Sequence, residues 1–322
     1  MAATEFGLID RIAAAFARPD PARAPLGIGD DAALLRLKPG HELVLSTDTL
    51  NAGVHFFADV PPADLGHKAL AVNLSDLAAM GAEPLGFTLA LSLPAIDADW
   101  CAALIAGMAA TAAAHGIALV GGDTTRGPLS LTVTVLGELP TGQALRRDRA
   151  RPGDVVAVSG RLGDAAGALR ALLASEPTDP ALLQALQRPE PRLALGRALR
   201  GLAHAAVDVS DGLLADLGHI ARASGVVARV DSMRLPVSAV LKAARPADWA
   251  DCALAGGDDY ELCVTLPPAH WTEAQARAEA LGVPLTRIGE CRAPSAGESP
   301  GVWLDGAPAP VRRGWDHFGG SE

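Results

Sequence analysis

The segment that decides the fold runs from Ala69 to Leu91 and reads ALAVNLSDLAAMGAEPLGFTLAL. Its first half continues an apolar stripe of helical period, so we expect a helix over residues 64–80. Large apolar side chains then alternate with smaller residues up to Leu93, which predicts a strand. One carboxylate, Asp76, falls on the apolar stripe, where helix capping does not explain it. A carboxylate in such surroundings needs a partner that neutralises its charge.

Several other acids share this setting, because each lies beside Gly, Ser or Thr at the end of a short apolar run. These acids are Asp30, Asp31, Asp48, Asp123, Asp208, Asp211, Asp258 and Asp259. Hard oxygen ligands in this number favour Mg²⁺, which in enzymes usually accompanies phosphates. The sequence therefore suggests a phosphate-handling enzyme with a magnesium site.

Ordinary local roles compete with this interpretation at several acids. Asp30 and Asp31 also suit a solvated turn between glycines. Ser46, Thr47 and Asp48, which we expect at the carboxyl end of a strand, also suit a cap or turn. Ser210 or Asp211 also suits the cap of the helix that follows.

Composition limits the classes of partner. The 322 residues contain 27 Lys and Arg against 37 Asp and Glu, which gives a net charge of −10. This balance argues against a nucleic acid or an anionic membrane surface as a partner. Hydrophobic residues make up 49% of the chain, enough for a substantial core. The length is that of one large or two medium domains.

The compartment is predicted to be the cytoplasm. The four cysteines, at positions 101, 252, 263 and 291, include no C-x-x-C pair, so we expect free thiols in a reducing compartment. The amino-terminal sequence MAATEFGLIDRI lacks the cationic region of a signal peptide. Residues 102–120 read as a helix, a Gly stop and a strand rather than a membrane span.

A basic stretch divides the chain. Residues 141–153 are polar and contain Arg146, Arg147, Arg149 and Arg151, so we place a linker there. The expected domains are residues 1–140 and 154–322. The four arginines suit a solvated loop, or one of them contacts a polyphosphate.

Familiar nucleotide motifs are absent from the sequence. There is no GxxxxGK[ST] loop, no HRD or DFG set and no GxGxxG in a suitable context. A phosphotransferase with this sequence would therefore hold ATP through acids, metals and glycines, for example the Gly-Gly-Asp at residues 121–123, interpreted as a turn after a strand.

Seven motifs, spread in order over nearly the whole chain, together carry a family resemblance. They are GIGDDAALL (27–35), STDTLNAGVHF (46–56), KALAVNLSDLAAMGAEP (68–84), GGDTTRGPLSLT (121–132), DVSDGLLADLGHI (208–220), GGDDYELC (256–263) and GWDHF (314–318). The chain resembles the thiamine-monophosphate kinase family, within the ATP-binding superfamily of aminoimidazole ribonucleotide synthetase.

The resemblance implies a fold and a reaction. The fold is two-domain, α/β plus α+β, with amino-terminal sheets that pair across a homodimer. The reaction is ATP-dependent phosphorylation of thiamine monophosphate to thiamine diphosphate, with several Mg²⁺ ions.

The resemblance also implies site residues by motif. Mg²⁺ ligands would be Asp31, Ser46, Thr47, Asp48, Asp76, Asp123, Asp208 and Asp211, of which Asp48, Asp76 and Asp123 are also expected to be catalytic. ATP contacts would be Gly122, Asp123, Arg147 and Ser210. Thiamine monophosphate contacts would be His55, Asp258 and Trp315. The family is expected to carry Glu more often at position 258, so the contact of Asp258 is either direct or through water.

The chemistry of the implied reaction favours direct transfer without a phosphoenzyme. The acceptor phosphate is already an oxyanion near neutral pH, because its second pKa is about 6, so no general base is required. Catalysis then consists of positioning and charge neutralisation.

Two alternative functions remain at this stage. One is another enzyme of the superfamily, such as a purine-pathway synthetase, a selenophosphate synthetase or a hydrogenase-maturation protein. The selenophosphate synthetase is expected to show an amino-terminal Cys or selenocysteine near Lys, and the hydrogenase-maturation protein a terminal Cys; neither feature is present. The STDTL-x-x-GxHF pattern argues against the purine-pathway synthetase. The other alternative is a non-catalytic nucleotide or Mg²⁺ module, which the presence of every acid disfavours.

Overall fold

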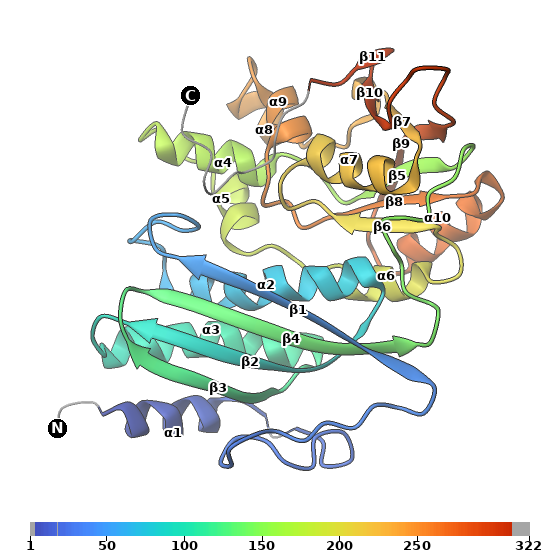
Figure 1. Cartoon of the computed structure of the whole chain (residues 1–322). Helices are drawn as coiled ribbons and strands as arrows, with labels where there is room; N and C mark the ends of the chain where they lie inside the picture. Colours follow the sequence, from blue (N-terminus) through green and yellow to red (C-terminus); the bar gives the residue numbers. More distant parts are fainter. Residues whose placement is uncertain (1–3, 18, 311–322) are drawn as a thin grey trace. The chain divides into compact units, whose positions relative to one another are not determined.

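The computed structural model describes residues 4–17 and 19–310, and the chain divides into two compact units (Figure 1). The first unit comprises residues 1–77 and 82–142, and the second comprises residues 78–81 and 143–322.

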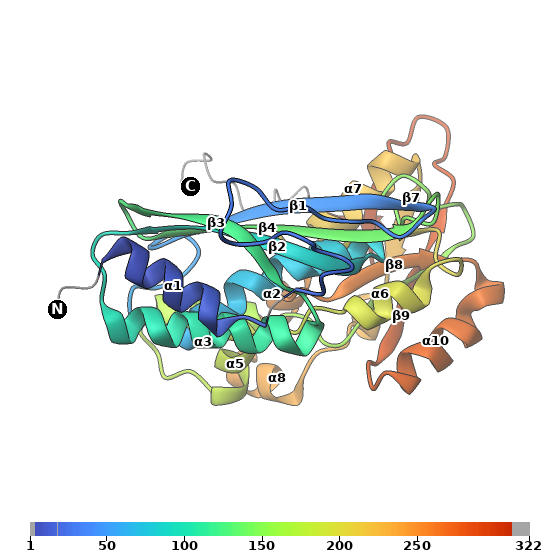
Figure 2. The same ribbon diagram turned by 90° about the horizontal axis from the view of Figure 1, so that it is seen from below.

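The first unit is a four-stranded sheet with helices on one side (Figure 2). Its elements are α1 (Glu5–Ala15), β1 (His41–Asn51), α2 (Pro62–Met80), β2 (Glu83–Leu93), α3 (Ala98–His115), β3 (Leu119–Arg126) and β4 (Ser130–Pro140). The strand order is β1-β4-β2-β3, with β2 and β3 parallel and the other pairs antiparallel. The predicted helix and strand around Ala69–Leu91 are therefore α2 and β2.

The side chains of α2 and β2 explain why these elements pack together. Leu70, Leu74 and Leu77 of α2 are completely buried, as is Phe87 of β2, which makes an edge-to-face contact with Phe16 at 5.6 Å between ring centroids. Aliphatic side chains thus form the greater part of this core, as the low aromatic content of the sequence requires.

The other face of the four-stranded sheet is open within the described part of this unit. Its hydroxyl ladder joins Thr47 to Thr134 at 2.9 Å and Thr49 to Thr132 at 2.8 Å. Leu45, on the same face of β1, is 62% exposed. This face therefore mixes apolar and hydroxyl side chains, and no helix among the described residues of the first unit covers it (Figure 2).

The second unit contains a seven-stranded mixed sheet in the order β11-β10-β7-β9-β5-β8-β6. The strands are β5 (Val155–Ser159), β6 (Ala205–Asp208), β7 (Val227–Val230), β8 (Leu262–Leu266), β9 (Leu285–Arg292), β10 (Gly301–Leu304) and β11 (Ala307–Pro308). The helices are α4 (Asp164–Leu173), α5 (Pro180–Gln187), α6 (Leu193–Leu199), α7 (Leu213–Ser224), α8 (Ala239–Ala244), α9 (Trp249–Ala255) and α10 (Trp271–Ala280), with 3₁₀ turns at Ser232–Arg234 and Pro268–His270.

Two apolar clusters stabilise the second unit. The larger one joins α7, through residues such as Leu217 and Ile220, to the buried faces of the central strands. The smaller one lies among α4, α5, α8 and α9, where Leu182, Leu241 and Cys252 are buried together. The larger cluster fixes α7 against the sheet, and α7 begins next to the predicted acids Asp208 and Asp211.

Two strands are longer than the sequence suggested. β1 continues beyond Ser46, Thr47 and Asp48 instead of ending at them, because β4 pairs with it along its whole length. β3 likewise runs through the predicted turn at Gly121, Gly122 and Asp123, because parallel pairing with β2 continues there. Pairing partners distant in sequence therefore override the local turn signals.

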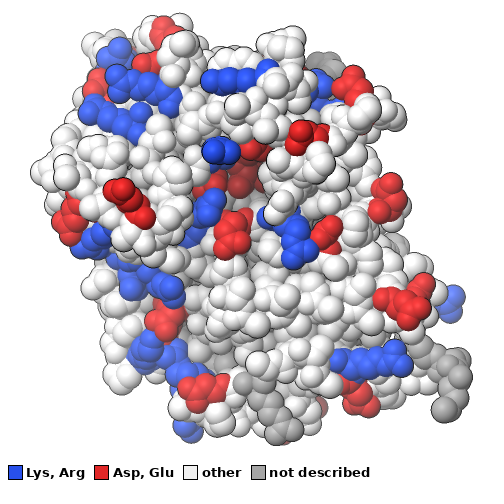
Figure 3. Space-filling model, turned by 180° about the vertical axis from the view of Figure 1, so that it is seen from behind, with Lys and Arg blue, Asp and Glu red and all other residues white. Residues whose placement is uncertain are grey.

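Charge and membrane character follow the composition. On the face shown in Figure 3, basic and acidic side chains are interspersed. Among residues 4–17 and 19–310, no helix is both long and apolar enough to cross a membrane.

An ion-pair cluster near the smaller apolar cluster gives a test by acid unfolding. Arg245 and Arg170 donate hydrogen bonds to Asp248 and lower its pKa to about 2. Since the folded pKa lies below the unfolded value near 3.9, the charged carboxylate stabilises the fold above pH 4, and this contribution is lost between pH 4 and pH 2. We expect Asp248→Asn to cost about 1 kcal/mol at pH 7, after allowance for partial exposure.

The measurement is denaturant unfolding at pH 7, 4 and 3. The difference from the parent protein should narrow as the pH falls, whereas Glu279→Gln, at an exposed carboxylate on α10, should change little at any pH. A constant difference over this range would contradict the assignment.

Candidate active site

The first cluster of predicted site residues joins β1 to α2. The hydroxyl of Ser46 donates to Asp76 Oδ2 at 2.5 Å. The backbone N–H of Asp48 donates to Asn73 Oδ1 at 3.0 Å, and Asn73 Nδ2 in turn donates to the carbonyl of Ala69 within α2. Because alternate residues of a strand share a face, Ser46 and Asp48 both lie toward α2. The structure therefore brings Ser46, Asp48 and Asp76 together.

Thr47 lies on the opposite face of β1. Its hydroxyl pairs with that of Thr134 on the open side of the sheet. The side chain of Thr47 therefore does not join the cluster of Ser46 and Asp76, and only its backbone atoms remain for a metal contact.

Gly122 and Asp123 occupy β3 next to β2. A Cβ atom at Gly122 would lie 2.0 Å from the carbonyl oxygen of Leu89, so no other residue fits without moving a strand. Asp123 is exposed and lies opposite Ala90 in the parallel register. Close approach of the backbone, rather than a turn, explains this glycine.

Asp31 lies on a loop whose two ends are tied to one buried carboxylate. Glu138 of β4 is completely buried; it pairs with Arg23 at 2.5 Å before the loop and accepts the N–H of Lys38 at 2.9 Å after it. The carboxylate of Asp30 accepts the N–H of Asp31 at 2.8 Å. The loop is thus anchored, and Asp31 is exposed on it.

His55 follows β1 in a turn. The backbone N–H of Asn51 donates to His55 Nδ1 at 3.0 Å. A neutral His55 therefore carries its proton on Nε2.

The second cluster begins where β6 ends. Asp208 is 3% exposed, and the residues after it lead into α7. The Oδ2 atom of Asp216, inside α7, accepts the backbone N–H groups of Ser210 and Asp211 at 3.0 Å and of Gly212 at 3.1 Å. Gly212 is the N-cap residue and has no side chain to offer, so neither Ser210 nor Asp211 caps α7.

Asp216 was not singled out in the sequence, although a signal was present. It lies on the buried stripe of α7 with Leu213, Leu217 and Ile220, in the same relation that Asp76 has to α2. Burial, with the negative charges of Asp208 and Asp211, raises the pKa of Asp216 to about 7. A bound divalent cation would relieve this repulsion.

The segment Gly256–Glu261 packs directly on the residues after β6. The N–H of Asp258 donates to the carbonyl of Ser210 at 2.9 Å, and the N–H of Tyr260 donates to that of Val209 at 2.8 Å. Asp258 and Tyr260 have positive φ angles of 67° and 51°, which non-glycine residues seldom adopt. Such strain persists where the surrounding contacts impose it, and it often marks functional sites.

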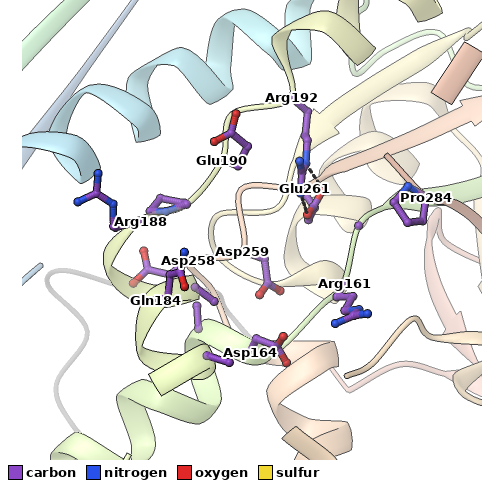
Figure 4. A pocket seen from close by; sticks show the side chains of 15 residues that line it. Arg161, Asp164, Gln184, Arg188, Glu190, Arg192, Asp258, Asp259, Glu261 and Pro284 are labelled. Atoms are coloured by element: carbon purple, nitrogen blue, oxygen red, sulfur yellow. Dashed lines mark hydrogen bonds and ion pairs between the residues drawn. The ribbon is translucent and has the colours of Figure 1, made fainter. Parts of the chain in front are cut away.

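Asp258 lies at one side of a pocket of about 420 Å³ in the second unit (Figure 4). Gln184 lies next to Asp258, while Asp164 and Arg161 lie on another side, with Asp259 between them. Burial raises the pKa of Asp259 well above its usual value, although the N–H of Gly163 donates to both of its oxygens.

The back wall of this pocket is an ion pair. Arg192 donates two hydrogen bonds to Glu261, at 2.8 and 2.5 Å, and the hydroxyl of Ser159 donates to the same carboxylate. No separate role was predicted for Asp259 or for Glu261. The only sequence signals for these two residues were the second Asp of the GGDD motif and the Glu that follows Asp-Tyr.

Arg147 and Trp315 are the two predicted site residues that remain. Arg146 is paired with Asp148, whereas Arg147 is exposed and its carbonyl accepts the hydroxyl of Ser224. Trp315 lies outside the described residues.

The donor chemistry suits a hard cation. Carboxylate and hydroxyl oxygens are the ligands that Mg²⁺ prefers, and the two clusters supply little else. Within the described residues, no group of three or more His, Cys, Asp or Glu side chains is already arranged as a metal site.

Comparison with known proteins identifies the family. Residues 29–139 match the family model "AIR synthase related protein, N-terminal domain", and residues 151–298 match the corresponding C-terminal domain. The thiamine-monophosphate kinase of Salmonella typhimurium is 47% identical over 99% of both chains. The chain belongs to the thiamine-monophosphate kinase family.

Solved structures of thiamine-monophosphate kinases share the fold of this chain. The crystal structure of the enzyme from Stenotrophomonas maltophilia K279a is 53% identical, covers 96% of this chain and 99% of its own, and has a TM-score of 0.87. A structure of AaThiL complexed with AMPPCP and TMP is 33% identical, covers 98% and 97%, and has a TM-score of 0.78. The two-domain fold that the motifs implied is thereby confirmed, and so is the assignment to an ATP-dependent phosphotransferase family.

Proposed function

We propose that this chain transfers the γ-phosphoryl group of ATP to the phosphate of thiamine monophosphate, which gives thiamine diphosphate and ADP. The observation that carries the proposal is the arrangement of Asp48 and Asp76, held by Asn73 and Ser46 on the facing elements β1 and α2, in a chain of this family. AaThiL, a relative of similar length, binds AMPPCP and TMP together.

Charge neutralisation is the main requirement of this reaction, since donor and acceptor are both anions. Bound Mg²⁺ would supply positive charge to the phosphates and polarise the transferred group. We propose as Mg²⁺ ligands in the first unit the side chains of Asp31, Ser46, Asp48, Asp76 and Asp123 together with the backbone of Thr47, and in the second unit the side chains of Asp208 and Asp211.

The acceptor phosphate needs no base from the protein. Its oxyanion is the nucleophile, and the γ-phosphorus–oxygen bond to ADP breaks as the new bond forms. The chain therefore contributes orientation and fixed charge, with Asp48, Asp76 and Asp123 closest to the chemistry.

Backbone contacts restrict how the nucleotide residues act. The N–H of Ser210 is committed to Asp216 and its carbonyl accepts from Asp258, so we assign its nucleotide contact to the hydroxyl. Gly122 offers backbone atoms next to Asp123. Of the two neighbouring arginines, Arg147 is the better ATP contact, because Arg146 is neutralised by Asp148.

We assign the thiamine monophosphate contacts to His55, Asp258 and Trp315. The Nε2 proton of neutral His55 is a suitable donor to a phosphate oxygen. Asp258 opens onto the pocket of Figure 4, where a carboxylate suits a cationic or amino-bearing heterocycle. Trp315 supplies an aromatic face for stacking.

The open face of the four-stranded sheet supports a homodimer. Leu43 and Leu45 are 46% and 62% exposed there, beside the threonine ladder. A second copy of this sheet would bury these side chains, and such isologous pairing is common. All four cysteines are buried and free, which suits a reducing, cytoplasmic location.

The reaction is tested by ADP release with ATP and Mg²⁺ in the presence of thiamine monophosphate, free thiamine or no acceptor. We expect ADP release that depends on thiamine monophosphate and matches the thiamine diphosphate formed. Absence of stimulation by thiamine monophosphate would reject the substrate and direct the search to purine-type acceptors.

Asp76→Asn tests the metal-ligand proposal. Loss of a preorganised charged ligand should lower kcat by about 100-fold or more. The matched control is Asp64→Asn, the same substitution in the first turn of α2, which should retain activity. Near-normal turnover of a folded Asp76→Asn protein would disprove the role.

Leu45→Lys tests the dimer. A buried lysine in each copy of the paired face should shift the protein toward the monomer in sedimentation velocity. Leu173→Lys, at a leucine that is 68% exposed on α4, should leave the oligomeric state unchanged. An unchanged dimer in Leu45→Lys would place the interface elsewhere.

A further inference from the structure

Two short segments of the second unit carry several of the residues proposed above. We define the acid loop as residues 208–212, which holds Asp208, Ser210 and Asp211, and the pocket loop as residues 256–261, which holds Asp258. Most of the acid loop and all of the pocket loop lie outside helices and strands, so contacts from elsewhere must fix them.

The acid loop is fixed by one carboxylate. Asp216 is 3% exposed, and its Oδ2 atom receives all three N–H groups of Ser210, Asp211 and Gly212. A helix-capping residue normally precedes its helix, whereas Asp216 lies four residues after the N-cap, among buried leucines. Placing a carboxylate there is unfavourable unless the loop needs this receptor.

The pocket loop is in turn fixed to the acid loop. Ser210 and Val209 accept the N–H groups of Asp258 and Tyr260 through their carbonyls. The loops meet backbone to backbone, because a Cβ at Gly257 would lie 2.2 Å from the carbonyl oxygen of Ser210. The hydroxyl of Tyr260 then donates to Asp258 Oδ1 at 3.0 Å.

We propose that Asp216 is a positioning residue that orders both loops. It acts on the nucleotide and metal residues through the N–H groups of the acid loop, and on the acceptor contact through the chain Asp216, Ser210, Asp258. The proposal rests on the proposed function for the identity of the two ligands, but the coupling of the loops does not.

The coupling predicts a joint effect on both substrates. Asp216→Asn keeps the shape of the side chain but replaces the carboxylate by a neutral amide, whose single oxygen accepts the three N–H groups more weakly and whose NH₂ group cannot accept them. We expect kcat to fall by about 30- to 100-fold, as for a displacement of order 1 Å, and the KM for thiamine monophosphate to rise although Asp216 does not line the pocket.

The matched control is Asp154→Asn. Asp154 is also buried, at 2% exposure, accepts the N–H of Arg151 at 2.8 Å and faces His204 at 2.9 Å, but it contacts neither loop in these interactions. We expect this variant to lose thermal stability while both KM values stay near those of the parent protein.

Tyr260 gives a direct readout, because it is the only tyrosine in the chain. Protein labelled with 3-fluorotyrosine, once shown to retain activity, should give a single ¹⁹F resonance from the pocket loop. We expect this resonance to broaden or split in Asp216→Asn at a temperature at which circular dichroism shows a folded protein, and to remain sharp in Asp154→Asn.

A second variant covers the case in which Asp216→Asn does not fold. Gly257→Ala separates the loops while Asp216 is retained, and we expect it to raise the KM for thiamine monophosphate and to shift the Tyr260 resonance.

The proposal is overturned if, in Asp216→Asn, the width of the ¹⁹F resonance and the KM values for ATP and thiamine monophosphate all stay within about twofold of those of the parent protein. It is also overturned if Asp154→Asn shows the same changes at an equal loss of stability. Failure of the parent protein to use thiamine monophosphate rejects the proposed function instead, and the ¹⁹F comparison still decides whether Asp216 orders the loops.

Discussion

A carboxylate on the apolar face of a helix needs polar groups that donate hydrogen bonds to it, and each unit of this chain contains a carboxylate with such donors. Asp76 on α2 receives the hydroxyl of Ser46, and Asp216 on α7 receives three backbone N–H groups. A buried charge without hydrogen-bond donors is costly, so these contacts constrain the neighbouring strand and loop as strictly as packing does. Asp48 in the first unit, through Asn73, and Ser210 and Asp211 in the second unit are held beside these two carboxylates.

Glycines make the second part of the design possible. At Gly122 and Gly257 another backbone approaches to a distance that a Cβ atom would not permit. Two backbones in direct contact fix each other's position closely, because no flexible side chain lies between them. The strained backbone at Asp258 and Tyr260 is held in the same manner, by hydrogen bonds to Val209 and Ser210.

The acidity of the chain and the anionic chemistry of its family are compatible for a physical reason. Carboxylates repel phosphates, but the same carboxylates concentrate divalent cations, whose charge attracts phosphates. The raised pKa values of Asp216 and Asp259 reflect burial first and the negative charges of neighbouring acids second. In the proposed mechanism, hard-oxygen clusters take the place of the glycine-rich phosphate loop that this sequence lacks.

The sequence by itself determined the helix and strand around Ala69–Leu91, the anomalous position of Asp76 and, through its ordered motifs, the family. Periodicity and motif spacing are local properties, so one chain suffices to read them. Only the tertiary structure decided that β1 and β3 run through their predicted ends, that Thr47 faces away from Asp76, and that Asp216 rather than Ser210 or Asp211 receives the N–H groups before α7. These outcomes depend on partners that strand pairing and helix packing bring together, such as Ser46 with Asp76 and Ser210 with Asp258, and local sequence does not encode which distant residue will arrive.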